Sequence, residues 1–258
     1  MNIIITLAGK SERFKKAGIV KPKFLLPIDK TTVIEKILES YDDQDNFHLV
    51  LTKSQIIKNK NLKYYLKKLK KNIYLNIIND HDFGPTYSAL KARTCELKKD
   101  IIVSYCDFLI DWDYKKFKRN IFEYDLGITS FRGFHPSSFS GTLYCYLKIK
   151  NNEIQKLREK QSFTTKPFNE FASAGSYYFK NFELLKYYSN KALNSKKLNT
   201  KFKEIYMSLP YLFALEEKKP ILNFELDKFI SLGTPRDYME YIDWFNFFKK
   251  KNLAEIYD

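Results

Sequence analysis

The chain has 258 residues, 44% of them hydrophobic, so it can bury a sizeable core in one α/β domain or in two small ones. Its formal net charge of +15 favours a polyanionic partner, such as nucleic acid, an anionic membrane surface or a small polyphosphate. No run approaches the ~20 apolar residues of a membrane span, and Met1 leads directly into a strand, so we expect no membrane association and no secretory signal. Cys95, Cys106 and Cys145 are well separated and form no CxxC pattern. They argue against a disulfide framework or a zinc site and favour a cytoplasmic location.

The chain begins with a strand and a basic loop. Residues 2–7 are rich in isoleucine, as is typical of a buried parallel strand. Small residues let backbone N–H groups approach phosphate oxygens, and cations neutralise the phosphate charge. The loop lacks the Gly-Lys-Ser/Thr of a P-loop and the glycines of a dinucleotide fingerprint, so the residues alone leave phosphate binding and a solvated loop equally open. The candidate residues are Leu7, Ala8, Gly9, Lys10, Ser11, Arg13 and, further on, Lys23.

Strands and helices then alternate. This alternation predicts a parallel sheet with helices on both faces, and the loops after Leu7, Ile78 and Tyr105 should converge at the carboxyl ends of the strands. We interpret the lysines of the helix predicted over 58–71 as a solvated outer face opposite an apolar stripe. The predicted elements are a helix over 31–41 with Thr32 and Glu35 as a capping box, a strand over 47–52, a lysine-rich helix over 58–71, a strand over 73–78, a short helix over 86–94 and a strand over 101–105.

The second half of the chain is predicted to form strands followed by helices. Asn151 and Asn152 fit a hairpin turn, and Thr234-Pro235 fits the start of a C-terminal helix. No Pro/Gly/Ser linker and no internal repeat divides the chain, so we expect one domain over residues 1–258. The predicted strands are 124–131, 142–149, 153–158, 173–179 and 221–224, and the predicted helices are 182–193, 200–217 and the C-terminal one.

A carboxylate stands at the end of an apolar strand, where Asp107 follows Val103-Ser104-Tyr105-Cys106. Such a group suits Mg²⁺, a hard ion that prefers oxygen ligands and is often shared with substrate phosphates. A helix cap is the equal alternative for Asp107. Asp111 and Asp113 are expected to start a helix, and His81 is expected to be a solvated loop residue.

Three segments, taken in order, resemble the nucleotidyltransferases that make nucleotide-activated sugars and related compounds. This resemblance implies an α/β fold with a Rossmann-like three-layer arrangement and a mostly parallel mixed sheet that carries a small acceptor-binding lobe. Residues 1–130 would mainly bind nucleotide, 131–235 would mainly bind acceptor, and 236–258 would form the C-terminal helix. The segments are Ala8-Gly9-x-Ser11-x-Arg13-Phe14 with Pro22-Lys23-x-Leu25-Leu26-Pro27, then Glu159-Lys160 with Ala172 to Phe179, then Ile230 to Tyr238.

The resemblance also implies roles for individual residues. Arg13 would stabilise the leaving pyrophosphate, Lys23 would contact the reacting phosphates, and Asp107 would bind Mg²⁺. Leu7 to Ser11 would wrap the nucleotide triphosphate. Gly84, Thr86 and Ser88 would surround the base, and Glu159, Lys160 and Gly175 would line the acceptor pocket.

This chain departs from the family pattern at three places. Ser11 stands where a second glycine is common. Gln161 replaces the proline that usually follows the Glu-Lys pair, which leaves Lys166 as a rival to Lys160. Ser231 replaces an aspartate that is the second metal ligand in many members, and Glu225 or Asp227, a few residues upstream, could fill that role.

Within the family, the cytidylyltransferases of bacterial capsule and surface-polysaccharide pathways are most similar. The resemblance implies transfer of CMP from CTP to a small phosphorylated acceptor, with phosphoglutamine as one candidate. A sugar-1-phosphate nucleotidyltransferase using UTP, GTP or dTTP is the first alternative. A basic nucleic-acid-binding protein and a glycosyltransferase using Asp111-Trp112-Asp113 as a metal motif are alternatives from other classes.

Overall fold

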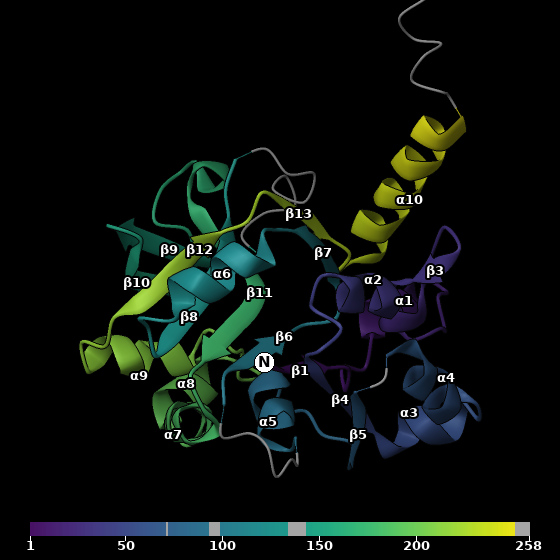
Figure 1. The fold of residues 1–258 in the computed structure, drawn as a ribbon, viewed down its shortest axis with the longest axis horizontal. Coiled ribbons are helices and arrows are strands. Elements are labelled where there is room, and N and C mark those ends of the chain that lie inside the picture. The colour runs from purple at the N-terminus through teal and green to yellow at the C-terminus, as the bar shows by residue number, and fades with distance from the viewer. Residues whose placement is uncertain (71, 93–98, 134–142, 251–258) are drawn as a thin grey trace, which may run out of the picture.

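A nine-stranded sheet runs through the part of the chain that the structure describes (Figure 1). The structure is a computed structural model and describes residues 1–70, 72–92, 99–133 and 143–250. The strands lie in the order β5 (Ile73–Ile78), β4 (Asn46–Thr52), β1 (Asn2–Thr6), β6 (Ile101–Ser104), β11 (Phe171–Phe179), β8 (Leu126–Phe131), β12 (Ile221–Glu225), β10 (Glu153–Glu159) and β9 (Cys145–Lys150).

The sheet has a parallel part and a closed part. β5, β4, β1 and β6 run parallel to one another. β11 is antiparallel to both β6 and β8, while β12 is parallel to β8. β9 pairs with β10 and again with β11, so the last five strands close into a ring. The α/β class and the mixed sheet are confirmed, whereas the ring departs from the open three-layer arrangement that we expected.

Strand β1 is buried on both faces and therefore separates two cores. Ile3 and Ile5 face one core and Ile4 faces the other, because successive side chains of a strand point to opposite faces. Both faces of the parallel part are thus covered by helices, as expected. The first core includes residues of α1 (Glu12–Lys16), α2 (Val33–Glu39), α4 (Leu62–Leu69) and α6 (Tyr114–Ile121), and the second includes residues of α5 (Pro85–Leu90), α7 (Phe182–Leu193) and α9 (Pro210–Glu216).

Several local predictions are confirmed. The Thr32 hydroxyl and the Glu35 side chain form both bonds of the capping box at the start of α2. α4 buries Leu62 and Leu66, and its lysines lie outside, as the amphipathic pattern predicted. Asn151 and Asn152 make the turn between β9 and β10 with φ of 53° and 61°, the left-handed values that a tight hairpin needs.

Two predicted helices differ from the observed ones. The lysine-rich helix predicted over 58–71 is the shorter α4, and a break separates it from α3 (Lys53–Lys58), which ends where the predicted helix began. The helix over 200–217 is replaced by α8 (Lys196–Lys201) and α9, and residues 202–209 between them, here named the bridging segment, form no regular helix or strand. Pro210 explains the second break, because proline fits the first turn of a helix but not its interior.

The remaining elements complete the fold. The sequence did not predict β7 (Phe108–Asp111) or β13 (Lys228–Ser231), and Asp111 ends β7 instead of starting a helix. Asp113 does cap α6 as expected, since its carboxylate accepts a hydrogen bond from the backbone N–H of Lys116. Four short elements fill the connections: η1 (Lys23–Leu25), β2 (Pro27–Ile28), β3 (Thr31–Thr32) and η3 (Pro167–Asn169).

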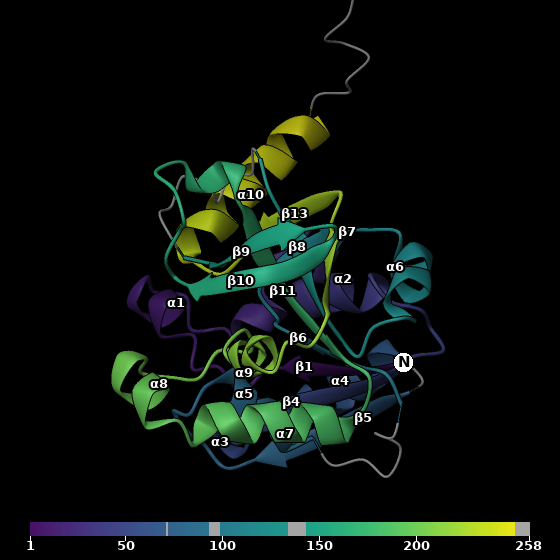
Figure 2. The same ribbon diagram turned by 90° about the vertical axis from the view of Figure 1, so that its left-hand side faces the viewer.

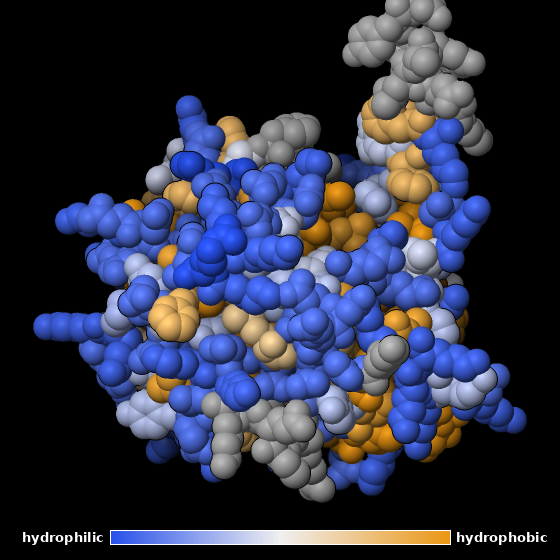
Figure 3. Space-filling view, viewed as in Figure 1, coloured by the Kyte–Doolittle hydropathy of each residue, from blue (hydrophilic) through white to orange (hydrophobic). Residues whose placement is uncertain are grey.

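The C-terminal helix α10 (Pro235–Lys250) starts where the sequence predicted and projects from the rest of the protein (Figures 1 and 2). Hydrophilic residues cover most of the face shown in Figure 3. No helix of the described ranges is both long and apolar enough to span a bilayer. Cys95, the end of the predicted helix 86–94 and the first residue of the predicted strand 142–149 lie outside the described residues.

Candidate active site

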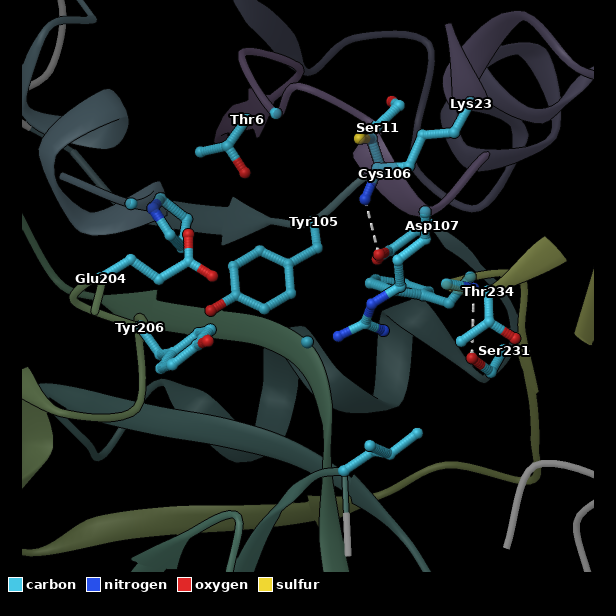
Figure 4. Close-up of a pocket in the computed structure, with 18 of the residues that line it drawn as sticks. Thr6, Ser11, Lys23, Tyr105, Cys106, Asp107, Glu204, Tyr206, Ser231 and Thr234 are labelled. Carbon is cyan, nitrogen blue, oxygen red and sulfur yellow. Dashed lines mark hydrogen bonds and ion pairs between the residues drawn. The ribbon is translucent and has the colours of Figure 1, made fainter. Parts of the chain in front are cut away.

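One cavity of about 560 Å³ lies at the carboxyl ends of β1 and β6. The loops after β1, β5 and β6 all contribute to its lining, so the predicted convergence of the three loops is confirmed. The other half of the chain contributes residues from β9 to β11, the bridging segment and the start of α10. Figure 4 shows Lys23 and Asp107 on one side of this cavity, with Glu204 and Tyr206 on another.

The loop after β1 presents small and basic residues to the cavity. Ser11 has φ of 53° and ψ of 36°, the left-handed conformation that glycine adopts most easily, which accounts for the glycine common at this position in the resembling family. Phe14 is buried and anchors the short helix α1 that follows. The Leu7 side chain is buried in the first core and lies outside the cavity lining. The predicted residues that do line the cavity here are Ala8, Gly9, Lys10, Ser11 and Arg13.

An ion pair joins the two predicted catalytic segments. Lys23 Nζ lies 2.7 Å from Asp107 Oδ2, and their side chains are 20% and 24% exposed. Burial by itself would lower the pKa of Lys23, but the adjacent Asp107 carboxylate outweighs burial, so the pKa is raised and Lys23 stays charged at neutral pH. Burial raises the pKa of the neighbouring Cys106 thiol to about 11, so Cys106 is no nucleophile near neutral pH.

Oxygen atoms from the end of β13 lie beside Asp107. The backbone N–H of Leu232 donates to the Asp107 carbonyl at 2.7 Å, which fixes this segment against the end of β6. A Cβ atom on Gly233 would lie 3.4 Å from Asp107 Oδ2 and 3.5 Å from Ser231 Oγ, so both side-chain oxygens border the same small space. No group of three or more His, Cys, Asp or Glu side chains suited to a metal occurs among the described residues.

Glu225 and Asp227, which we predicted as possible second metal ligands, lie outside the cavity lining. β13 pairs antiparallel with β7 so that Ser231 is opposite Phe108 and Lys228 is opposite Asp111. Asp227 therefore lies beyond the far end of this ladder, roughly 13 Å from Ser231 at ~3.3 Å per residue. Glu225 forms an ion pair with Arg132, and neither carboxylate lines the cavity.

The loop after β5 is held at the cavity by unusual backbone geometry. Gly84 has φ of 88°, and a Cβ there would lie 2.9 Å from both the backbone N and O of Ile205, so only glycine fits. Ser88 lines the cavity as predicted, and its hydroxyl contacts His81 Nε2 at 3.0 Å. The Phe83 N–H donates to His81 Nδ1, so His81 holds the loop instead of being solvated as expected, and burial lowers its pKa.

The prediction for Thr86 is corrected. Its side chain is fully buried, and its hydroxyl lies away from the cavity lining in the interior of the protein. Only its backbone takes part in this region, through an N–H bond of 3.2 Å to the Ile205 carbonyl. The structure thus places the Thr86 side chain in the interior and not at the cavity.

Glu159, Lys160 and Gly175 line the cavity on the opposite side. Glu159 Oε2 accepts a hydrogen bond of 2.5 Å from Ser208 Oγ, and burial raises the pKa of this carboxyl group. The Lys160 ammonium contacts the Tyr206 hydroxyl and lies 4.2 Å from the centre of that ring. Gly175 has φ of 84°, and a Cβ there would lie 2.7 Å from the Phe108 ring.

Lys166, the rival to Lys160, does not line the cavity. Its backbone N–H bonds to the Thr164 hydroxyl within an exposed loop. The structure thus places Lys160 and not Lys166 beside the candidate acceptor region.

The bridging segment supplies residues that the sequence did not single out. Its backbone is fixed on two sides: Ile205 N–H donates to the Phe83 carbonyl at 3.1 Å, and Met207 N–H donates to the Tyr105 hydroxyl at 2.9 Å. Pro210 is the sequence signal that could have revealed the bridging segment. A proline does not fit the interior of a helix, so a helix predicted across Pro210 has to break before it. The residues that the bridging segment adds to the lining are Lys203, Glu204 and Tyr206.

The alternative metal motif, Asp111-Trp112-Asp113, lies outside the cavity lining. Asp111 forms an exposed ion pair with Lys228, and Asp113 caps α6. The Trp112 indole donates to the Ser40 carbonyl at 2.8 Å. These contacts give the three residues structural roles and remove the observation that favoured a glycosyltransferase.

The fold matches those of several solved structures. A nucleoside-diphosphate-sugar pyrophosphorylase from Vibrio cholerae superposes with a TM-score of 0.74 at 16% identity, over 94% of this chain and 100% of that one. A UDP-glucose pyrophosphorylase complexed with UDP-glucose gives 0.72 at 15% identity, over 97% and 99%. The inositol-1-phosphate CTP transferase from T. maritima gives 0.67 at 12% identity, over 92% and 90%.

The chain has the fold of these pyrophosphorylases and transferases. No protein-family model and no curated protein matches its sequence. Because the identities are low, the likeness concerns the fold, and the function has to be argued from the residues of the cavity.

Proposed function

We propose that the protein is a nucleotidyltransferase, in which a phosphate oxygen of an acceptor attacks the α-phosphorus of a nucleoside triphosphate and pyrophosphate leaves. The observation that carries this proposal is the arrangement of the cavity. A basic loop of small residues, the Lys23–Asp107 ion pair and a lysine on the opposite side all face one space at the carboxyl ends of β1 and β6. Solved structures of the same fold carry pyrophosphorylase and CTP transferase names, which supports the proposal.

The cationic residues would make the main contribution to catalysis. The nucleophile is already an anion, so the reaction needs no general base, and catalysis depends on positioning and on neutralising charge. Arg13 and Lys23 would bind the triphosphate and stabilise the charge that builds on the leaving pyrophosphate. Lys160, on the other side of the cavity, would hold the acceptor phosphate in line with the bond that breaks.

The donor set beside Asp107 fits Mg²⁺. The Asp107 carboxylate and the Ser231 hydroxyl are hard oxygen donors bordering one space, and Mg²⁺ is commonly bound by one or two carboxylates, substrate phosphates and several waters. When bound, the ion would neutralise triphosphate charge. Asp107 would hold it, and Lys23 would turn from Asp107 to the phosphates.

The base and the acceptor form the finer part of the proposal. We propose CTP as the donor, on the resemblance of the sequence to cytidylyltransferases, and a small phosphorylated acceptor such as phosphoglutamine. UTP, GTP or dTTP with a sugar 1-phosphate is the alternative, and solved structures of this fold include UDP-glucose pyrophosphorylases. Ser88 and the backbone around Gly84, which line the cavity, would contact the base.

Pyrophosphate release tests the proposal directly. The purified full chain is incubated with Mg²⁺ and each of the four common nucleoside triphosphates. The acceptor panel contains phosphoglutamine, phosphocholine and several sugar 1-phosphates. We expect acceptor-dependent release with one triphosphate strongly preferred. No release with any pair, together with tight salt-sensitive binding to DNA or RNA, would instead favour a nucleic-acid-binding protein.

A further inference from the structure

Ser231 stands where the resembling family carries an aspartate, and its hydroxyl is held in a fixed orientation. The backbone N–H of Gly233 donates to Ser231 Oγ at 3.3 Å. Ser231 Oγ in turn lies 3.2 Å from Asp237 Oδ2, and a carboxylate can only accept, so the serine proton points to Asp237. One lone pair of the serine oxygen is left for a further partner, in the space that it shares with Asp107.

Asp237 is a buried carboxylate that lines the cavity. It lies in the first turn of α10, is 8% exposed, and its backbone N–H is bound by the Thr234 hydroxyl at 3.1 Å. No lysine, arginine or histidine of the described residues lies within ion-pair distance of it, and Arg236 pairs with Glu240 instead. A buried anion without a cationic partner is costly, so the site would gain from a cation in the cavity.

We propose that Asp237 supplies the second carboxylate of the cation site. It would act by polarising Ser231 and by accepting hydrogen bonds from metal-bound water, in place of the aspartate missing at position 231. Mg²⁺ usually keeps several waters, so a carboxylate behind the first ring of ligands still contributes to its binding. The inference rests on the proposed function and adds a residue to it.

The test is a Mn²⁺ titration followed by electron paramagnetic resonance, with the full chain and a non-hydrolysable CTP analogue. Mn²⁺ replaces Mg²⁺ as the probe, and the readout is the amount of bound ion, not turnover. We expect Asp237→Asn to weaken Mn²⁺ binding about 10-fold or more, in the range that the loss of an outer-shell partner typically causes. Asp243→Asn is the matched control, since Asp243 is exposed on the same helix.

Ser231→Asp in the Asp237→Asn background separates a cation role from a purely structural one. If Asp237 only caps α10, Asp237→Asn lowers the thermal unfolding midpoint without weakening Mn²⁺ binding to the folded protein. If Asp237 supplies the missing charge, an aspartate at 231 restores it. A thermal unfolding midpoint for each variant shows whether the fold survives.

Four outcomes are distinguishable. Equal Mn²⁺ affinity in wild type and Asp237→Asn overturns the inference. The inference is also overturned if Asp237→Asn loses Mn²⁺ binding only because the variant unfolds, and if Ser231→Asp does not restore that binding. Pyrophosphate release by a wild type that binds no Mn²⁺ also overturns the inference, yet leaves the proposed function standing. Firm Mn²⁺ binding without release for any substrate pair overturns the proposed function instead.

Discussion

The loop after β1 and the bridging segment face each other across one cavity, but the sequence reveals them to very different degrees. Residues 8–14 follow a strand with a clear pattern, and small and basic residues occupy fixed positions behind it. Residues 202–209 have no such pattern and resemble the middle of a helix. Their structure comes from contacts with distant parts of the chain, namely Phe83, Tyr105, Glu159 and Lys160.

This difference teaches where the two kinds of proposed substrate contact originate. The proposed triphosphate loop is specified locally, because its geometry depends on a strand end and a short helix adjacent in sequence. The candidate acceptor region is specified globally, because the bridging segment must be packed by both halves before Tyr206 can reach Lys160. Changes in the first region should affect chemistry, and changes in the second should affect acceptor binding and stability.

The largest effect is expected for Lys23→Ala. We expect kcat to fall at least about 100-fold, because losing a charge-assisted contact to the reacting phosphates costs roughly 3 kcal/mol in the transition state. Arg13→Ala should behave similarly. Steady-state kinetics with saturating substrates measure this, with the exposed Lys15→Ala as control. Wild-type turnover in Lys23→Ala would remove the loop from the active site.

Gly84→Ala should lower the free energy of unfolding by about 2–3 kcal/mol, since the added Cβ meets the Ile205 backbone and the left-handed φ disfavours alanine. Urea denaturation measures this change. Gly9→Ala is the control for stability, because no atom lies within 4 Å of a Cβ at Gly9. Equal stabilities for the two variants would mean that the bridging segment does not press on the Gly84 loop.

Lys160→Ala should raise the acceptor KM about 10-fold or more and leave the triphosphate KM nearly unchanged, because its partner would belong to one substrate only. Lys166→Ala is the matched control and should change neither constant. Initial rates at varied acceptor and triphosphate concentrations separate the two effects. The opposite result would mean that Lys166 and not Lys160 serves the acceptor.

Tyr206→Phe should raise the acceptor KM only about threefold, because the ring remains over Lys160 while one hydrogen bond of roughly 0.5–1.5 kcal/mol is lost. Tyr206→Leu removes the ring as well and should approach the effect of Lys160→Ala. Tyr64→Phe, on the exposed side of α4, is the control. A change in kcat without a change in acceptor KM would contradict a positioning role for Tyr206.

The smallest effect is expected for Ser11→Gly, which should stabilise the protein by up to about 1 kcal/mol. Ser11 holds a left-handed conformation that costs a non-glycine residue roughly 1–2 kcal/mol, and the greater freedom of glycine in the unfolded chain offsets part of the gain. Thermal unfolding measures this shift. A loss of stability would show that the serine side chain has a role of its own in the loop.

The fold could be predicted largely from local patterns. The isoleucines of β1, the capping box of α2 and the asparagine turn after β9 each rest on neighbouring residues, and all appear as predicted. The closure of β9 onto β11 could not be predicted, because such pairing depends on long-range register and not on local sequence. The same holds for β7 and β13, which are only four residues long.

The residues of the candidate site also fall into those that the sequence could locate and those that it could not. Asp107 and Lys23 were located by strand-end position and by resemblance, and the structure brings them together. Asp237 and Tyr206 were missed because nothing in their local sequence separates a cavity residue from an ordinary helix or loop residue. Glu225 and Asp227 were misplaced because the β7–β13 ladder, which sets their distance from Asp107, was not foreseen.

The Lys23–Asp107 ion pair has a consequence for the order in which ligands enter. While the pair is closed, the ammonium neutralises the carboxylate and competes with any cation for it. A triphosphate that attracts Lys23 releases Asp107, so the nucleotide and the divalent ion should strengthen each other's binding. Linkage makes this coupling reciprocal: the factor by which nucleotide tightens the metal equals the factor by which metal tightens the nucleotide. A single salt bridge would thus make the nucleotide-free protein indifferent to free magnesium and responsive to the magnesium–nucleotide complex.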